Sequence, residues 1–351
     1  MSNRKLGLAI AGLGNWGSRV LRAFARVDRA EVLALCDLDP ARLAAHSRGS
    51  GGASMHTDLS RALADGGVEA VVIATPPASH APLALQALRA GCDVLVEKPM
   101  ALCPEDAGAL EDAANGAGRQ LMVGHILHYH PAFECLQELL AAGKLGRLRH
   151  VLCERRGRST PRHETAWWSL APHDLSLLRL LFGNDPSSLT ASAARGVSPD
   201  VVNADLTFPD GGTARIEVSA VDPHKTRRLT IVGERGVAVF DDREPEHKLR
   251  LYAVPAADHH GPGLALDRIA RSPACLGGEC IDVPVLSEEP LVREACHFVH
   301  SILDGRPVRT GASLGRSVVR WLAEGQAQLD AAEARAAVRP SWEGKPPLAP
   351  A

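Results

Sequence analysis

The sequence predicts an α/β protein, in which a doubly wound parallel sheet precedes an α+β domain with an open, mainly antiparallel sheet. Three observations support this. An apolar run over 6–11 leads into a glycine-rich turn, apolar strands then alternate with helices as far as residue 124, and short strands separated by turns follow from residue 150. We therefore expect domains over 1–124 and 125–338, and a proline-rich tail over 339–351.

The glycine-rich turn has the spacing G-x-G-x-x-G, formed by Gly12, Gly14 and Gly17. The first glycine permits a tight turn, the second lets the backbone approach a pyrophosphate, and the third lets the next helix press against the sheet. The start of that helix offers unpaired N–H groups and a positive dipole end to phosphates. The turn therefore predicts a dinucleotide site, which we expect to include Asn15 and Trp16.

A second strand, expected over 31–36, ends at Asp37, twenty residues beyond Gly17. A carboxylate at this place accepts both ribose hydroxyls of an adenosine and repels a 2′-phosphate, so NAD is favoured over NADP. The alternative is an ordinary turn residue before Asp39-Pro40. Arg42 can still accommodate a phosphate, which keeps NADP possible.

The later strands of the first domain end in polar loops. Strands are expected over 68–74, 94–96 and 121–124, with helices over 20–27, from Pro40, and over 59–64, 82–90 and 106–116. Ligands of such sheets bind beyond the carboxyl ends of the strands. The cofactor site is therefore expected to include Thr75, Pro76, His80, Glu97, Lys98 and His125.

Beyond His125 the chain changes character. A helix is expected over 131–142, then strands over 150–156, 188–195, 201–208, 213–220, 227–232 and 237–241, with a helix over 172–182 between the first two. Residues 259–280 are expected to be loop, and 290–303 and 313–332 to be amphipathic helices.

The composition excludes several functional classes. The 351 residues are 45% apolar and carry a net charge of −2 without long basic runs, which argues against nucleic acid or a membrane surface as partner. The eight cysteines stand isolated in apolar stretches, so we expect reduced thiols and a cytoplasmic protein. Cys275 and Cys280, after His259-His260, are poorly spaced for zinc, and no metal is expected.

Four motifs together resemble a known family. They are Ala74-Thr75-Pro76-Pro77 with Ser79-His80, Glu97-Lys98-Pro99, Val123-Gly124-His125 running to Pro131, and Ala171-Pro172-His173-Asp174. In this order and spacing they are similar to the glucose-fructose oxidoreductase, inositol dehydrogenase and rhizopine-catabolism (Gfo/Idh/MocA) family. The resemblance covers nearly the whole chain. It implies a Rossmann domain, a nicotinamide cofactor, hydride transfer at a carbinol carbon of a sugar or polyol, and assembly as a homodimer or homotetramer through the open sheet.

Oxidation of a secondary alcohol needs a group that takes the hydroxyl proton as hydride leaves. Lys98 is the expected base, because partial desolvation beside a cofactor lowers the pKa of a lysine. His173, expected at a helix start, titrates in the useful range. The alternatives are a lysine that only binds a cofactor hydroxyl and a histidine that only caps a helix or fills the core.

The substrate is less well specified. The site is expected to include Arg158, Trp168 and Ser169 with Lys98 and His173, and the basic residues Arg155, Arg156, Lys225, Arg227 and Arg228 suit an anionic group if they face the cleft. Two short segments, 171–176 and 223–228, resemble the branch acting on nucleotide sugars. Inositol-type members have an Asp where Ser169 stands. Two alternatives therefore stay open: an imine or tetrapyrrole-type reductase, and a catalytically silent nucleotide-binding sensor or scaffold.

Overall fold

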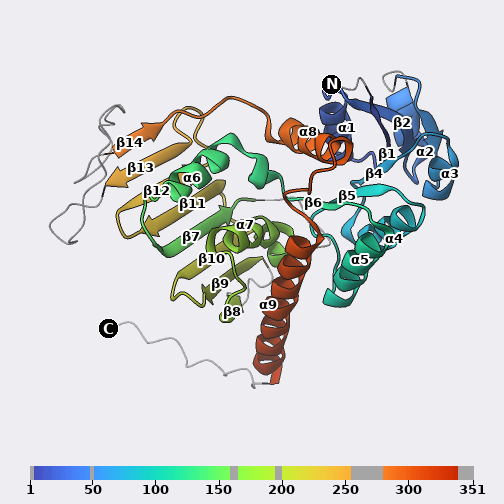
Figure 1. Ribbon diagram of the computed structural model, residues 1–351. Helices are drawn as coiled ribbons and strands as arrows, with labels where there is room; N and C mark the ends of the chain where they lie inside the picture. The colour runs from blue at the N-terminus through green and yellow to red at the C-terminus, as the bar shows by residue number, and fades with distance from the viewer. Residues whose placement is uncertain (1–3, 48–50, 159–164, 194–199, 254–279, 339–351) are drawn as a thin grey trace, which may run out of the picture.

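The computed structural model of the protein describes residues 4–47, 51–158, 165–193, 200–253 and 280–338. It contains two sheets, which Figure 1 shows side by side, the first flanked by helices on both faces and the second open on one face. The predicted fold class is confirmed. None of the described helices is long and apolar enough to cross a membrane.

The first sheet is entirely parallel, with the strand order β3-β2-β1-β4-β5-β6. Its strands are β1 (Leu6–Ala11), β2 (Ala30–Cys36), β3 (Ser54–His56), β4 (Ala70–Ile73), β5 (Asp93–Glu97) and β6 (Leu121–Gly124). Its helices are α1 (Gly17–Phe24), α2 (Pro40–His46), α3 (Leu59–Ala64), α4 (His80–Arg89) and α5 (Pro104–Ala117). The strand order reverses between β1 and β4, and this switch point leaves a crevice for a ligand beyond the strand ends.

Local sequence explains where these helices begin and end. The Asp39 carboxylate accepts from the Ala41 N–H at the start of α2, and that of Asp58 accepts from the Ser60 N–H at the start of α3. The α5 helix ends at Gly118, whose φ of 63° lies in the left-handed region. The first two caps hold loops at the carboxyl edge of the sheet, and the third ends α5 before β6 begins at Leu121.

The second sheet has the strand order β14-β13-β12-β11-β7-β10-β9-β8, and its neighbours are antiparallel except for β7 and β10. The strands are β7 (Leu148–Arg156), β8 (Ser188–Ala193), β9 (Val201–Thr207), β10 (Thr213–Ser219), β11 (Thr226–Gly233), β12 (Gly236–Asp241), β13 (Leu249–Ala253) and β14 (Cys280–Val283). The sheet's apolar face packs against α6 (Pro131–Ala141), α7 (Ala166–Phe182) and α9 (Ala312–Val338).

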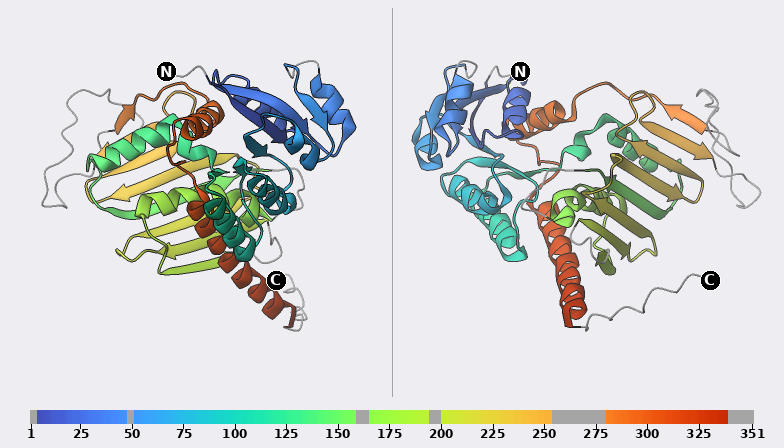
Figure 2. Two further views of the ribbon diagram at one scale, coloured as in Figure 1. Left: turned by 45° about the vertical axis from the view of Figure 1, so that its right-hand side comes forward. Right: turned by 180° about the vertical axis from the view of Figure 1, so that it is seen from behind.

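The helix α8 (Pro290–Leu303) returns to the first sheet, as Figure 2 shows. It packs against α1, where the rings of Phe24 and Phe298 meet edge to face at 6.4 Å. Leu291 and Val299 are buried in the same apolar cluster as the strands β1 and β4. A segment near the end of the chain therefore completes the surface of the first sheet.

The predicted start of the 172–182 helix is wrong. The helix α7 begins at Ala166, because the Thr165 hydroxyl accepts from the Trp168 N–H and caps it, and Pro172 lies inside the helix. Proline has no N–H to donate to the Trp168 carbonyl, but the neighbouring turns are buried in the core and stay helical. His173 is therefore in mid-helix and cannot be a capping residue.

Three strands were not predicted from the sequence, namely β3, β13 and β14. The first is only three residues long, and the other two flank a segment without a regular pattern. The expected loop over 259–280 lies outside the described residues except for Cys280, which begins β14, and so do His259, His260, Cys275 and the tail.

Candidate functional site

A cavity of about 410 Å³ lies at the carboxyl edge of the first sheet. Its walls come from the glycine-rich turn, from the loops after β4, β5 and β6, and from α7. The predicted site residues that line it are Trp16, Thr75, His80, Glu97, Lys98 and His173. Ala74, Pro77, Gly124 and Ile126 also line it. The first three belong to the motifs that carry the family resemblance but were not predicted as site residues, and none of the four has a polar side chain that would signal a site.

The three glycines of the turn meet three different geometric requirements. Gly12 has a φ of 91°, and a Cβ there would stand 2.6 Å from the Ala74 carbonyl oxygen. A Cβ at Gly17 would stand 1.8 Å from the Gly12 carbonyl oxygen, so α1 can press against the turn only with glycine at this position. At Gly14 the nearest atom is 3.9 Å away, which leaves the backbone open to a ligand.

Asp37 is buried at the end of β2, and backbone N–H groups fix its carboxylate. Leu13 donates to one oxygen at 2.6 Å and Asp39 to the other at 2.9 Å. The Arg42 guanidinium is 3.6 Å from the first oxygen and 3.5 Å from the Asp39 carboxylate. The site therefore presents a rigid negative charge, and Arg42 is engaged with carboxylates of the chain.

The Glu97 carboxylate connects the glycine-rich turn to β5, since it accepts from the Trp16 indole N–H at 2.5 Å and from the Lys98 N–H at 3.3 Å. Burial raises its pKa, while the Trp16 hydrogen bond and the Lys98 charge act in the opposite direction. Glu294, buried on α8, is close enough for its own pKa to be raised well above the ordinary value by burial and then by Glu97. Nothing in the sequence connected Glu294 with this site.

Lys98 and His173 are brought together by α7. The Lys98 ammonium donates to the Ser169 carbonyl oxygen at 2.8 Å, and His173 follows one helical turn later. Both side chains line the cavity. On the opposite wall, the two ring nitrogens of His80 lie 2.8 Å from the carbonyl oxygens of Thr75 and Pro99, which joins the loops after β4 and β5.

Two histidines near this cavity have ring nitrogens without hydrogen-bond partners among the described residues. These are both nitrogens of His125, which is buried directly after β6, and Nδ1 of His173. Burial lowers the pKa of each well below 6.5, and the positive charge of Lys98 lowers both further. The rings are therefore neutral. His173 lines the cavity, whereas His125, predicted for the cofactor site, is buried behind Gly124 and does not.

Behind His173, the Asp174 carboxylate accepts two hydrogen bonds from the Arg155 guanidinium, at 2.7 and 2.9 Å. Both side chains are buried. This bidentate pair ties α7 to β7 and fixes the orientation of the helix that carries His173.

The other predicted residues lie outside the cavity lining. Asn15 and Arg158 are exposed, and Pro76 stands in the loop that begins at Ala74. Trp168 is partly buried against the apolar core of the second sheet. Substrate contact by Arg158 and Trp168 therefore stays a prediction.

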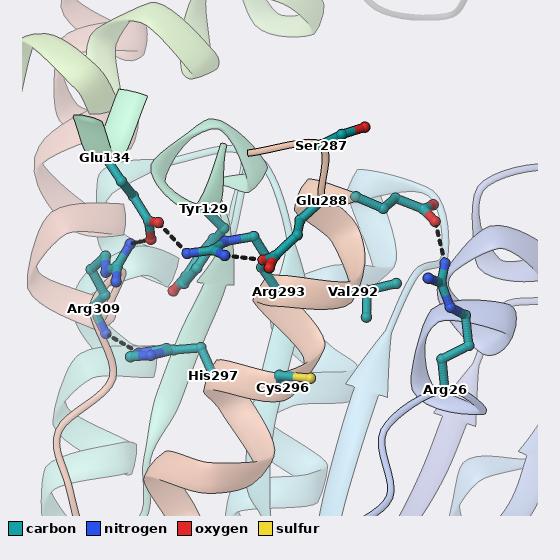
Figure 3. Close-up of a pocket in the computed structure, with 11 residues that line it drawn as sticks. Arg26, Tyr129, Glu134, Ser287, Glu288, Val292, Arg293, Cys296, His297 and Arg309 are labelled. Atoms are coloured by element: carbon teal, nitrogen blue, oxygen red, sulfur yellow. Dashed lines mark hydrogen bonds and ion pairs between the residues drawn. The ribbon is translucent and has the colours of Figure 1, made fainter. Parts of the chain in front are cut away.

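A second cavity, of about 540 Å³, lies on the far side of α8 (Figure 3). Its three arginines are paired with carboxylates of the chain: Arg26 with Glu289, Arg293 with Glu288 and Glu134, and Arg309 also with Glu134. It is away from the strand ends, and its charges are compensated, so we do not assign the chemistry to it.

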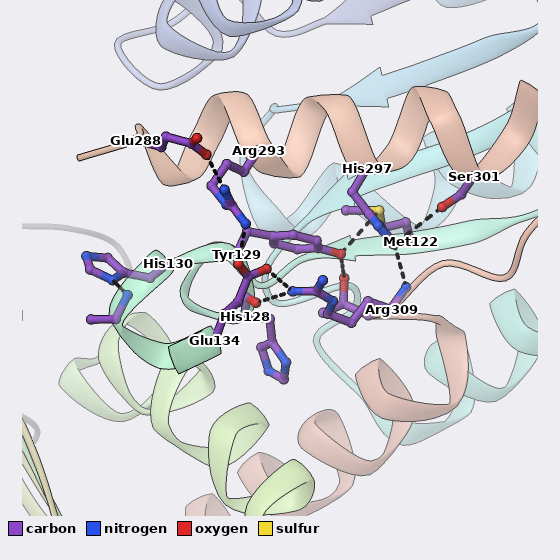
Figure 4. Close-up of polar contacts among 12 residues, drawn as sticks. Met122, His128, Tyr129, His130, Glu134, Glu288, Arg293, His297, Ser301 and Arg309 are labelled. Atoms are coloured by element: carbon purple, nitrogen blue, oxygen red, sulfur yellow. Dashed lines mark hydrogen bonds and ion pairs between the residues drawn. The ribbon is translucent and has the colours of Figure 1, made fainter. Parts of the chain in front are cut away.

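The floor of this second cavity has a structural role (Figure 4). The Tyr129 hydroxyl lies 3.1 Å from the Thr310 hydroxyl, and the Arg309 guanidinium stands 5.0 Å above the Tyr129 ring. The Arg309 N–H donates to the His297 ring at 2.9 Å. These contacts hold the crossing segment η3 (Ile126–Tyr129), which follows His125, against α8.

Family models match both parts of the chain. Residues 6–125 match the NAD-binding Rossmann fold of the Gfo/Idh/MocA oxidoreductase family, and residues 133–239 match the C-terminal domain of the same family. The chain is 31% identical to inositol 2-dehydrogenase 4 of Saccharopolyspora erythraea over 63% of this chain and 65% of that protein. It is 30% identical to the UDP-N-acetylglucosamine 3-dehydrogenase of Acidithiobacillus ferrooxidans over 72% of this chain and 76% of that protein.

Solved structures agree. That UDP-N-acetylglucosamine 3-dehydrogenase superposes with a TM-score of 0.78 at 26% identity, covering 93% of this chain and 98% of that one. A putative oxidoreductase from Magnetospirillum magnetotacticum superposes with a TM-score of 0.77 at 31% identity, covering 91% and 99% of the two chains. The matches extend through both sheets.

Proposed function

The chain belongs to the Gfo/Idh/MocA family of oxidoreductases, and from this membership we propose that it is an NAD-dependent dehydrogenase acting on a secondary alcohol of a sugar, polyol or nucleotide sugar. The observation that carries the proposal is that Lys98, which follows β5 of the first sheet, and His173, on the helix α7 that packs against the second sheet, line one cavity beside the glycine-rich turn. The relatives named above are dehydrogenases of an inositol and of a nucleotide sugar. They favour this activity over the imine reductase and the silent sensor.

The residues present fit NAD. The open backbone at Gly14 and the start of α1 suit the pyrophosphate, and the fixed carboxylate of Asp37 suits the ribose hydroxyls. The cavity beyond β4 and β5, with Glu97 at its wall, suits the nicotinamide. When bound, the nicotinamide supplies the hydride acceptor.

The proton is handled by the chain. We assign Lys98, in its neutral amine form, as the group that takes the hydroxyl proton, because the Ser169 carbonyl in the first turn of α7 holds its side-chain nitrogen at the cavity. His173 has a neutral ring, which keeps one N–H, so it can donate a hydrogen bond to the oxygen of the same hydroxyl and orient it. The backbone carbonyl of Ser169 contacts the lysine, so the chain positions Lys98 without an acidic side chain at 169.

The test is a spectroscopic assay of reduced nicotinamide across sugars, polyols and sugar nucleotides. On an accepted substrate, Lys98→Met should lower turnover by about 10² to 10⁴ while NAD affinity stays within a few fold. His173→Ala should lower turnover and weaken substrate binding together. Lys144→Met, at an exposed lysine after α6, is the matched control. Near-normal turnover in both site variants would overturn the assignment; loss of NAD binding in Lys98→Met would make Lys98 a cofactor ligand.

We also propose a homodimer or homotetramer that forms through the open face of the second sheet, and a cytoplasmic location. Leu152, Thr230 and Val239 lie side by side on β7, β11 and β12, partly exposed on the face that α6, α7 and α9 do not cover. This row is an apolar stripe that a second copy can bury. Light scattering should give a mass that is a multiple of the chain mass. Val239→Glu should lower this mass, because it places a charge in the stripe that the second copy buries.

A further inference from the structure

The basic residues near the catalytic cavity divide into two groups. Arg155 is paired with Asp174. Arg156 and Arg228 lie on the open face of the second sheet, where Arg156 pairs with Glu154 and Glu217, and Arg228 pairs with Asp241. Carboxylates of the chain neutralise these three arginines, so none of them offers an uncompensated charge to a ligand.

Arg227 is different. It stands directly opposite Arg155 in the β7–β11 register, on the face that the helices cover. Its guanidinium donates only to the backbone carbonyls of Arg156 and Thr226, the latter at 2.7 Å, and no described carboxylate lies within ion-pair distance of it. Like charges directly opposite each other in a sheet are destabilising. Burial and then the Arg155 charge lower the pKa of Arg227 to about 10.

Three further cations, Lys225, Arg243 and Arg19, have no ion pair within the described part of the chain. Lys225 precedes β11, Arg243 follows β12, and Arg19 lies on α1, two residues after Gly17. Burial, Arg227, Arg243 and Arg19 all lower the pKa of Lys225. The cluster therefore extends from the second sheet to the helix that follows the glycine-rich turn.

Two carboxylates, Asp174 and Asp242, act on Arg227, but Asp174 is paired with Arg155 and Asp242 also has other partners. Asp242 lies 3.4 Å from the His130 ring and 3.7 Å from the Lys248 ammonium. The cluster keeps a net positive charge. It also lies close to the catalytic pair, since Arg227 stands opposite Arg155, which binds Asp174, the residue after His173 in α7. The Arg227 charge is accordingly one of those that lower the pKa of His173.

We propose that Arg227, Lys225, Arg243 and Arg19 form an anion subsite for the substrate, next to the cavity that holds Lys98 and His173. The substrate is then a sugar that carries a carboxylate or a diphosphate, rather than a neutral polyol. The proposal rests on the proposed function for the identity of the cavity. An anion between Arg227 and Lys225 supplies the countercharge that the chain lacks, and a guanidinium binds carboxylate or phosphate oxygens in pairs.

The test uses the full chain saturated with NAD. Calorimetric titrations with UDP, inorganic diphosphate and glucuronate separate a diphosphate from a carboxylate, and uridine and glucose are the neutral counterparts. We expect at least one anion to bind, and Arg227→Met to weaken that binding about tenfold or more. The melting temperature of Arg227→Met should be unchanged or higher, because the variant removes a like-charge pair. Lys225→Met should act in the same direction.

The matched control is Arg179→Met, which removes an arginine at the end of α7 whose partner Asp185 keeps Arg320. It should leave anion binding unchanged. The proposal is overturned if none of the three anions binds, if the neutral counterparts bind as well, or if Arg227→Met leaves binding intact. It is also overturned if Arg227→Met weakens NAD binding equally, because the cations then serve the cofactor. Anion binding without any hydride transfer would refute the proposed function alone.

Discussion

At the scale of single residues, the glycine-rich turn separates structural from ligand-binding requirements. Gly17 has no room for a side chain because the Gly12 carbonyl oxygen occupies the place of its Cβ, whereas Gly14 has open space. The same motif thus contains one glycine that the packing of α1 requires and one whose backbone is left open.

A pair of alanine variants should show this difference. Gly17→Ala should lower the free energy of unfolding by about 1 to 3 kcal/mol, because α1 must move away from the turn. Gly14→Ala should leave unfolding nearly unchanged and weaken NAD binding by about tenfold, because its methyl group stands between backbone and pyrophosphate. Urea denaturation and calorimetry measure the two effects. Equal destabilisation by both variants would contradict the distinction.

Asp37 should determine the choice of cofactor. Its fixed carboxylate should favour NAD over NADP by roughly 1 to 3 kcal/mol, comparable to a charge-assisted hydrogen bond. In Asp37→Ser the gap should narrow, because the 2′-phosphate is no longer repelled and Arg42 loses one of its two carboxylate partners. Titration of both cofactors into both proteins gives the comparison. Equal or tighter NADP binding by the parent protein would refute the preference.

At the scale of elements, α7 connects the core of the second sheet with the candidate site at the carboxyl edge of the first sheet. Its buried face packs on the sheet, its Ser169 carbonyl holds Lys98, and its Asp174 binds Arg155 on β7. The orientation of His173 depends on this last contact, because no described group pairs with its Nδ1.

The Arg155–Asp174 pair should be strongly coupled. Asp174→Leu alone should destabilise the protein by about 3 to 5 kcal/mol, since Arg155 is then buried without a countercharge and faces Arg227. The double variant Arg155→Leu with Asp174→Leu should recover much of this loss. Urea denaturation of the two single variants and the double variant forms the cycle. A coupling energy near zero would show that the pair contributes only through packing.

At the scale of the whole molecule, buried histidines make stability depend on pH. Burial lowers the pKa of His125 and His173 well below 6.5, that of His128 to about 3, and that of His297 to about 4. All four rings are neutral in the folded chain. Below about pH 6.5 the unfolded chain takes up protons on them, so acidification favours unfolding.

Three carboxyl groups act in the opposite direction. Burial raises the pKa of Glu97, Glu294 and Asp93, so the folded chain holds protons on them that the unfolded chain has released above about pH 4.5. The four histidines outweigh these three carboxyls, so the free energy of unfolding should fall by roughly 2 kcal/mol for each unit by which the pH is lowered near pH 5.5. Urea denaturation at pH 7.5, 6.5 and 5.5 measures the slope. His128→Gln should lower the number of protons taken up on unfolding by about one, and the slope falls accordingly. A slope of opposite sign would show that the carboxyl groups dominate.

Local patterns in the sequence were sufficient to predict much of the fold. The limits of β6, α3 and α8 agree with the predicted ones because apolar periodicity and capping residues determine them. Pro172 misled the prediction of α7, because tertiary burial keeps the helix intact through a residue that usually begins or breaks one.

The candidate site was only partly predictable, for a different reason. Motifs identified Lys98 and His173, but their meeting in one cavity depends on how α7 packs against the first sheet. Which arginines remain uncompensated depends on strand register, since Arg155 and Arg227 share a face while Arg228 faces away. Glu294 approaches Glu97 from a helix almost two hundred residues away, and no local pattern signals such a contact.

The packing of α8 on α1 has a consequence for how the protein is made. The ribosome delivers all six strands of the nucleotide-binding sheet before residues 290–303 exist. Until those residues emerge, Phe24 and its apolar neighbours on that side of the nascent domain face water or a chaperone. We therefore expect that nascent chains stopped after β6 collapse without acquiring protease resistance, and that resistance appears only once α8 has left the exit tunnel.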